Sequence, residues 1–74
     1  MKNINITIFD GDEILHEYLS DIIPEIGDSI EIPEEYQKHK SNGIYEIIKI
    51  KNSGIYDVKK RVFVAHTNKV KIHI

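Results

Sequence analysis

The sequence predicts an all-β protein, specifically a small antiparallel barrel of the SH3-like or OB-like kind with five to six short strands. Apolar and polar residues alternate in several stretches, which is the period of a half-buried strand. The chain contains 16 isoleucines, two leucines and one alanine, and β-branched Ile favours strands, whereas Leu and Ala favour helices. Turn residues separate these stretches at short intervals. At 74 residues, residues 1–74 form one domain with a thin core.

The first half of the chain predicts a hairpin followed by a short strand. Residues 2–9 alternate strictly, and Asp10-Gly11 is a dipeptide typical of tight hairpin turns, so residues 13–20 form the returning strand. Pro24 cannot donate to a strand ladder, and the chain turns before residues 29–32 resume the strand pattern.

Residues 33–40 are the one segment in which the sequence allows a helix. Pro33 suits a first helical position, two glutamates follow it, and basic residues stand at the other end, as the helix dipole favours. The segment is short and lacks a capping residue at Ile32. The sequence is compatible with a short helical or 3₁₀ turn and with an irregular loop.

The second half returns to strand patterns. Strands are expected over residues 43–51, 55–58, 62–66 and 69–74, with a tight turn at 52–54 and a bend or solvated stretch at 59–61. In the last strand Val70, Ile72 and Ile74 are expected to face the core, and the residues between them to face solvent.

Composition excludes several classes of protein. No apolar run is long enough to cross a membrane, and no secretory signal is recognisable. The absence of cysteine excludes disulfides and thiolate zinc sites. Nine lysines against one arginine, together with the isoleucine excess, indicate an AT-rich gene of a low-GC bacterium or its phages. We therefore expect the protein in the cytoplasm of a bacterial host cell.

Three stretches carry a resemblance to known proteins: residues 8–15 (IFDGDEIL), 23–30 (IPEIGDSI) and 45–50 (YEIIKI). Over residues 4–50 the chain resembles small, uncharacterised phage and prophage β-barrel proteins of the SH3-like type. The resemblance implies a barrel fold and a phage setting, in which proteins of this size act in host takeover or against host defence. It implies no catalytic residue.

The chain divides into an acidic part and a basic part whose net charges nearly cancel. Up to Gln37 there are ten acidic residues and one lysine, a net charge of −9, and the remainder has nine basic and two acidic residues, a net charge of +7. Opposite charges paired between neighbouring strands explain this division in one way. Self-association into a homodimer or higher oligomer explains it in a second way, and a partner-binding surface in a third.

The function that the sequence favours is non-catalytic binding of a host protein, as in a host-takeover or anti-defence inhibitor. Exposed tyrosines often dominate protein interfaces, and an acidic turn can dock on a basic surface. The candidate residues for this role are Tyr18, Tyr36, Tyr45, Tyr56, Asp10, Asp12 and Glu13.

The alternative is a small barrel that binds a nucleic acid or nucleotide, including an oligomeric sponge for a signalling nucleotide. Its candidate residues are Lys49, Lys51, Lys59, Lys60 and Arg61. Lysines near tyrosines can contact phosphates and stack on bases, although the pI near 6.0 is low for such a protein.

The residues that bear chemistry are scattered, so we expect no enzyme, metal site or cofactor. The four histidines have no ligand-like spacing. The acidic turn at residues 10–13 lacks the spacing of a calcium loop, the serines and threonines fall at turns or on polar strand faces, and no Gly-rich phosphate loop is present.

Overall fold

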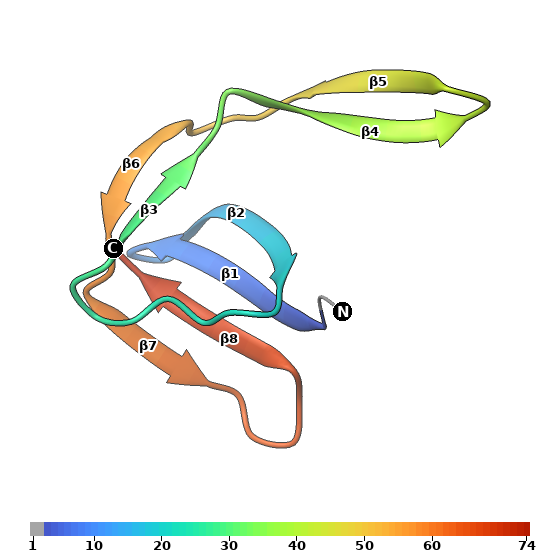
Figure 1. Cartoon of the computed structure of the whole chain (residues 1–74). Coiled ribbons are helices and arrows are strands. Elements are labelled where there is room, and N and C mark those ends of the chain that lie inside the picture. Colours follow the sequence, from blue (N-terminus) through green and yellow to red (C-terminus); the bar gives the residue numbers. More distant parts are fainter. Residues whose placement is uncertain (1–2) are drawn as a thin grey trace.

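The computed structural model describes residues 3–74, and its regular structure consists of eight β-strands (Figure 1). In chain order these strands are β1 (Ile4–Asp10), β2 (Glu13–Ser20), β3 (Ser29–Ile32), β4 (Glu35–Ser41), β5 (Ile44–Lys49), β6 (Gly54–Asp57), β7 (Lys60–Phe63) and β8 (Lys69–His73). They form one four-stranded sheet and two separate two-stranded ribbons.

The four-stranded sheet has the order β2-β1-β8-β7. The hairpins β1–β2 and β7–β8 are antiparallel, whereas β1 and β8 pair in parallel at the centre of the sheet. A backbone hydrogen bond from Asn5 N–H to the carbonyl of Asn68 extends this central pairing at 2.8 Å. The two ends of the described chain therefore build the middle of the sheet.

The core lies between one face of this sheet, called here the inner face, and the β3–β6 ribbon. Its buried side chains are Ile6, Ile8, Val70 and Ile72 from the two central strands, with Ile32 and Val58 from the other side. In β1 and β8 these are the alternate apolar positions, which is why the strand periodicity identifies them. Burying each such side chain contributes about 1.5 to 3 kcal/mol, so this small core holds the domain together.

The β3–β6 ribbon is held over the core at one end. Val58 N–H donates to the carbonyl of Asp28 at 2.9 Å, and Gly27 N–H donates to the carbonyl of Val58 at 3.0 Å. Gly27 has a φ of +95°, a conformation that favours glycine. The turn before β3 is therefore joined by backbone hydrogen bonds to Val58, in the segment between β6 and β7.

The β4–β5 hairpin projects from the rest of the molecule as an arm (Figure 1). The arm begins where Ile50 N–H donates to the carbonyl of Glu34 at 2.8 Å, and it turns at Asn42 and Gly43, both with positive φ. The radius of gyration is 13.5 Å, against about 11 Å for a compact chain of this length. The arm accounts for this elongated shape.

Several expectations are corrected. The all-β class is confirmed, but residues 3–74 form eight strands instead of five or six, and none of their sheets closes into a barrel. The expected helical turn or loop at 33–40 is wrong, because β4 occupies residues 35–41 and is stabilised by pairing with β5. The sheet is also not wholly antiparallel, because β1 and β8 pair in parallel. Local sequence patterns do not reveal this pairing, since the two strands are far apart in the chain.

Strand boundaries differ by a few residues from those expected. The expected bend at 59–61 is wrong in part, because Lys60 and Arg61 belong to β7, whose register with β8 places them opposite His73 and Ile72. The first strand was expected from Lys2, which lies outside the described residues, and β1 begins at Ile4.

Candidate protein-binding groove

An apolar groove of about 530 Å³ lies between β2, β3 and the base of the arm. Tyr18 and Leu19 of β2 line it, together with Ile30 of β3, Tyr36 of β4 and Ile50 after β5. These residues come from four separate parts of the chain and meet because the arm leaves the core beside the edge of the sheet. We call this space the β2–β3 groove.

Strand β2 borders the groove and is an edge strand. Among the strands that the structure describes, β1 is the only one with which β2 pairs. No second strand within residues 3–74 pairs with its other side, although the Asn52 side chain donates to the carbonyl of Leu15 at 3.4 Å, and such an edge can accept an additional strand.

Two acidic residues and a histidine accompany the apolar lining. Glu17 and Glu31 both line the groove, and Glu31 is exposed. His16 stacks on Tyr18 with ring centroids 6.1 Å apart and an angle of 20° between the rings. The groove is thus apolar inside and acidic at its rim.

Tyr18 is the most deeply placed tyrosine of the groove. Burial raises the pKa of its hydroxyl above the ordinary value of 10.0. The hydroxyl therefore stays protonated near neutral pH, where it can donate one hydrogen bond and accept others.

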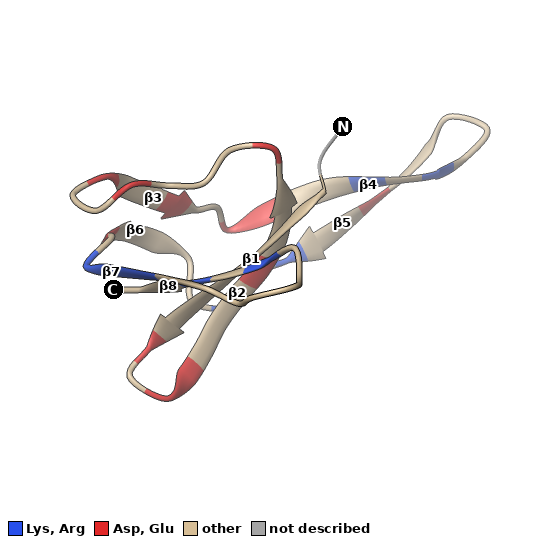
Figure 2. Ribbon diagram, turned by 90° about the horizontal axis from the view of Figure 1, so that it is seen from below, with Lys and Arg blue, Asp and Glu red and all other residues tan. Residues whose placement is uncertain are grey.

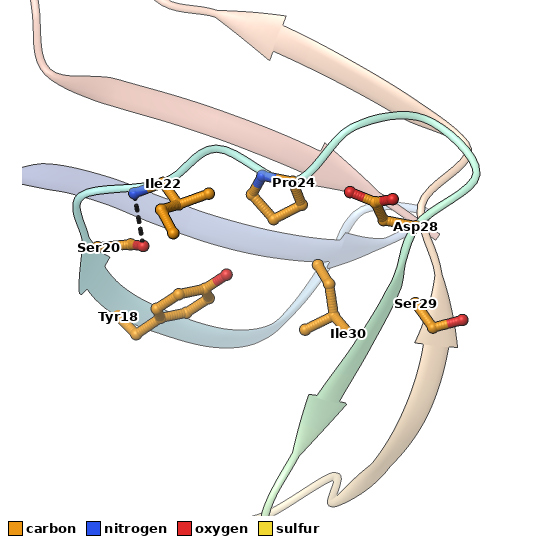
Figure 3. A pocket seen from close by; sticks show the side chains of 7 residues that line it. All are labelled: Tyr18, Ser20, Ile22, Pro24, Asp28, Ser29 and Ile30. Atoms are coloured by element: carbon orange, nitrogen blue, oxygen red, sulfur yellow. Dashed lines mark hydrogen bonds between the residues drawn. The ribbon is translucent and has the colours of Figure 1, made fainter.

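A second hollow of about 370 Å³ adjoins the groove (Figure 3). Tyr18 and Ile30 line both hollows, and Ile22 and Pro24 extend the apolar surface. The Ile22 N–H donates to the Ser20 hydroxyl at 3.0 Å, which fixes the chain where it leaves β2. The two hollows together follow β2 and β3 along their length.

The arm exposes an apolar surface that no other part of the described chain covers. Tyr45 is 58% exposed, and its ring lies 5.1 Å from that of His39. By register, Ile47 lies on the same face of the hairpin as these two rings. Ile44 is also 58% exposed, near the tip.

Two ion pairs support the arm. Lys49 lies 2.6 Å from Glu35 at its base, and Lys40 lies 3.1 Å from Glu46 nearer the tip. Both pairs are exposed, so each contributes at most about 1 kcal/mol. Because an isolated two-stranded hairpin is marginally stable in water, the arm gains from any surface that packs against it.

The structure brings together only some of the predicted protein-binding residues. Tyr18 and Tyr36 line one groove, whereas Tyr45 lies on the arm. Tyr56 packs partly against the core, and its hydroxyl donates to the carbonyl of Asn52 at 2.9 Å. These contacts explain Tyr56 as a structural residue and not as a binding residue.

The acidic turn is separate from the groove. Asp10, Asp12 and Glu13 are exposed at the turn between β1 and β2, and none of them lines the groove. Asp10 pairs with Glu13, so the two central residues of the turn are Gly11 and Asp12 and not the expected Asp10-Gly11. Gly11 has a φ of +60°, and glycine at the first central position is typical of a type II′ hairpin turn.

The predicted nucleic-acid-binding residues do not form one patch. Lys49 is ion-paired at the base of the arm, and Lys51 lies in the turn after β5. Arg61 donates to the carbonyl of Pro24 at 3.5 Å and lies over the ring of Phe63.

Lys59 and Lys60 are both exposed, and the Lys59 backbone N–H donates to the carbonyl of His73. Cross-strand neighbours share a face of a sheet, so Lys60, opposite His73, and Arg61, opposite Ile72, lie on opposite faces.

Sequence reasoning missed the apolar residues that complete the groove, namely Leu19, Ile30 and Ile50. Leu19 carried only a weak signal, because it alternates with Leu15 and Glu17 and both sides of this strand are mixed in polarity. The other two look like ordinary core residues until the position of the arm is known.

Within residues 3–74, no three histidine or acidic side chains gather where they could hold a metal ion. The same part of the chain contains no helix long and apolar enough to cross a membrane. Comparison with protein-family models, curated proteins and solved structures finds no match. The resemblance to phage β-barrel proteins therefore stays a prediction.

Proposed function

We propose that this is a non-catalytic binding protein of phage type that occupies a host protein, in host takeover or against host defence. The observation that carries the proposal is the unpaired edge of β2 beside an apolar groove that contains two tyrosines. An extended segment of the partner adds to this edge as a further strand, and its alternate side chains enter the groove.

The residues that line the groove indicate which kind of partner segment binds there. Apolar side chains fit against Tyr18, Leu19 and Tyr36, and amphipathic tyrosines are favoured where an interface is partly wet. Glu17 and Glu31 favour Lys or Arg at the positions between them. The preferred partner segment is therefore extended, with apolar and basic residues in alternation.

The exposed area supports a binding role. The accessible surface is 5650 Å², whereas a compact monomer of this mass exposes about 4,700 Å². The excess of about 950 Å² is close to the roughly 800 Å² that each partner contributes to a standard interface. The arm projects from the rest of the molecule (Figure 1) and provides the second contact region.

Capture from the lysate of a low-GC bacterium tests the proposal with matched variants. Leu19→Ser and Ile26→Ser each remove an exposed apolar side chain, 54% and 64% exposed respectively, but only Leu19 lines the groove. We expect Leu19→Ser to weaken capture of the partner and Ile26→Ser to retain it. Equal capture by both variants contradicts the role of the groove.

Hydrogen exchange on the captured complex locates the contact. Backbone amides at the unpaired edge of β2 exchange readily when they face water, and they slow when a strand pairs with them. We expect added protection on β2 and on the arm. Protection confined to β7, the opposite edge of the sheet, shows that the partner binds elsewhere.

A further inference from the structure

The face of the four-stranded sheet opposite the core carries exposed lysines around Thr7, which is 8% exposed, and it differs in chemistry from the groove. Register places Phe9 of β1, Lys69, Lys71 and His73 of β8, and Lys60 of β7 on this side. We call these five residues the outer face. The side chains that alternate with them in β8, Val70 and Ile72, are buried in the core.

Three lysines give the outer face its positive charge. Lys69 and Lys71 follow one another on the same side of β8, about 6.7 Å apart by strand geometry, and Lys60 lies on β7 opposite His73. All three lysines are exposed. Neither ion pair found in residues 3–74 involves them, since both pairs are in the arm.

An aromatic pair lies among these charges. The rings of Phe9 and His73 are stacked, with centroids 5.3 Å apart and an angle of 18° between them. The ammonium group of Lys71 lies 5.8 Å from the centre of the Phe9 ring, within the range of a cation–π contact. Both rings are half-buried, so the surrounding strands hold them in place while part of their surface remains accessible.

One acidic residue of β2, Glu17, lies on the same side of the sheet next to the outer face. Glu17 of β2 accepts a hydrogen bond from the Thr7 hydroxyl at 3.2 Å, and Thr7 lies opposite Lys71 in the β1–β8 register. Figure 2 shows the same division, with basic segments on β7 and β8 and acidic ones around β3 and the β1–β2 turn. An anionic ligand is therefore directed to β8 and β7 and away from β2.

We propose that the outer face binds single-stranded nucleic acid without sequence preference. Lys60, Lys69 and Lys71 neutralise phosphates, and an unstacked base packs on the Phe9–His73 pair. Lysines that track a backbone beside an aromatic stack are the combination that such ligands require. Accessible stacked rings on a sheet face favour single strands, whose bases are free to stack, over duplexes.

The five residues of the outer face do not line the β2–β3 groove, although Glu17 and Leu19 of the groove lie on the same side of the sheet by register. Only Lys60 belongs to the basic set expected from the sequence. The decisive residues are on β8 and at the end of β1, which the parallel pairing brings together. A failure of one proposal therefore leaves the other unaffected.

Fluorescence anisotropy with labelled oligothymidylate of about 12 nucleotides tests the proposal. Affinity is measured between about 50 and 200 mM salt, where log K falls with log salt with a slope of about −0.7 for each phosphate neutralised on a single strand. Three lysines predict a slope of about −2. A duplex of the same length is expected to bind more weakly.

Two triple variants with equal net charge separate a local effect from a general one. Lys60→Ala, Lys69→Ala and Lys71→Ala together are expected to reduce the salt slope to near zero and to abolish binding at the higher salt. The control combines Lys38→Ala, Lys40→Ala and Lys51→Ala, all exposed and outside the outer face, and is expected to keep the slope.

A variant of the ring tests the stacking contact separately. Phe9→Leu keeps an apolar side chain, so the sheet folds, and removal of one stacked base contact is expected to weaken binding about fivefold or more. Circular dichroism confirms folding of each variant. Absence of salt-dependent binding by the wild-type protein, or an equal loss in the two triple variants, overturns the proposal.

Discussion

Removal of the arm tests whether it serves binding or folding. Residues 35–49 are replaced by an Asn-Gly turn, because Glu34 and Ile50 are already joined by a backbone hydrogen bond of 2.8 Å, the geometry that a two-residue hairpin turn closes. None of the six buried core side chains lies in the deleted segment.

The expected energetic effect is small. The two exposed ion pairs that are lost contribute at most about 1 kcal/mol each, and the shorter connection recovers about 1 to 2 kcal/mol of loop-closure entropy. We therefore expect the free energy of unfolding to change by less than about 2 kcal/mol. The radius of gyration should fall from 13.5 Å to about 10 to 11 Å.

Small-angle scattering measures the size, and urea denaturation measures the stability, of the shortened chain. A folded, more compact protein that has lost its partner supports a binding role for the arm. An unfolded chain shows that the arm is needed for the fold, and a radius that remains near the original value shows that the hairpin does not project in solution. Either result refutes the reasoning.

Three further predictions concern the core, a turn and a titrating group. Ile72→Ala removes a fully buried side chain and should cost about 2 to 5 kcal/mol in urea denaturation, whereas Ile55→Ala, at a side chain 70% exposed, should cost less than about 0.5 kcal/mol. Gly11→Ala places a side chain at a φ of +60° and should lower stability by roughly 1 kcal/mol, visible as a lower melting temperature. The pKa of Tyr18 is raised by burial, so the native state holds this proton more tightly than the unfolded state. The stability that this contributes is complete below the ordinary tyrosine pKa of 10.0 and is lost as the pH rises through the folded value. Tyr18→Phe should reduce the alkaline loss of stability in denaturation at several pH values, and an unchanged pH profile contradicts the assignment.

Local patterns predicted the strands that carry their own signal. The first hairpin followed from strict alternation and a turn expected at Asp10-Gly11; β1 and β2 are observed there, with the turn one residue later, at Gly11 and Asp12. The last strand followed from the alternation of Val70 and Ile72 with charged residues, and both are buried. In these segments periodicity and turn chemistry agree, so tertiary structure has nothing to override.

The arm could not be predicted from local patterns, because the sequence of β4 has little strand signal of its own. Residues 35–41 are all exposed, and Tyr36 is their only large apolar residue. Pro33 followed by glutamates and then basic residues satisfies the rules for a helix start and end. The segment is a strand because β5, rich in Ile and Tyr, pairs with it.

The candidate site was only partly predictable for the same reason. Tyrosines were expected to serve as anchors, but which of them share a surface depends on contacts between distant segments. Tyr18 and Tyr36 meet because the arm leaves β3 beside β2, and Lys71 meets Phe9 because β8 pairs with β1. Single-sequence patterns carry no information about such long-range pairing.

The place of β8 in the sheet has a consequence for how the protein is made. β8 is the last strand in chain order and yet occupies the middle of the sheet, between β1 and β7, and the Asn68 side chain reaches the carbonyl of Asn3, 65 positions away. Before β8 is synthesised, the edge of β1 that pairs with β8 has no partner. Two of the six core side chains, Val70 and Ile72, are also still missing. Cooperative folding therefore waits until β8 has left the ribosome, and such distant pairing is slow to form. Until that moment β1 has one unpaired edge, and the side chains of Ile6 and Ile8 lack the packing of Val70 and Ile72.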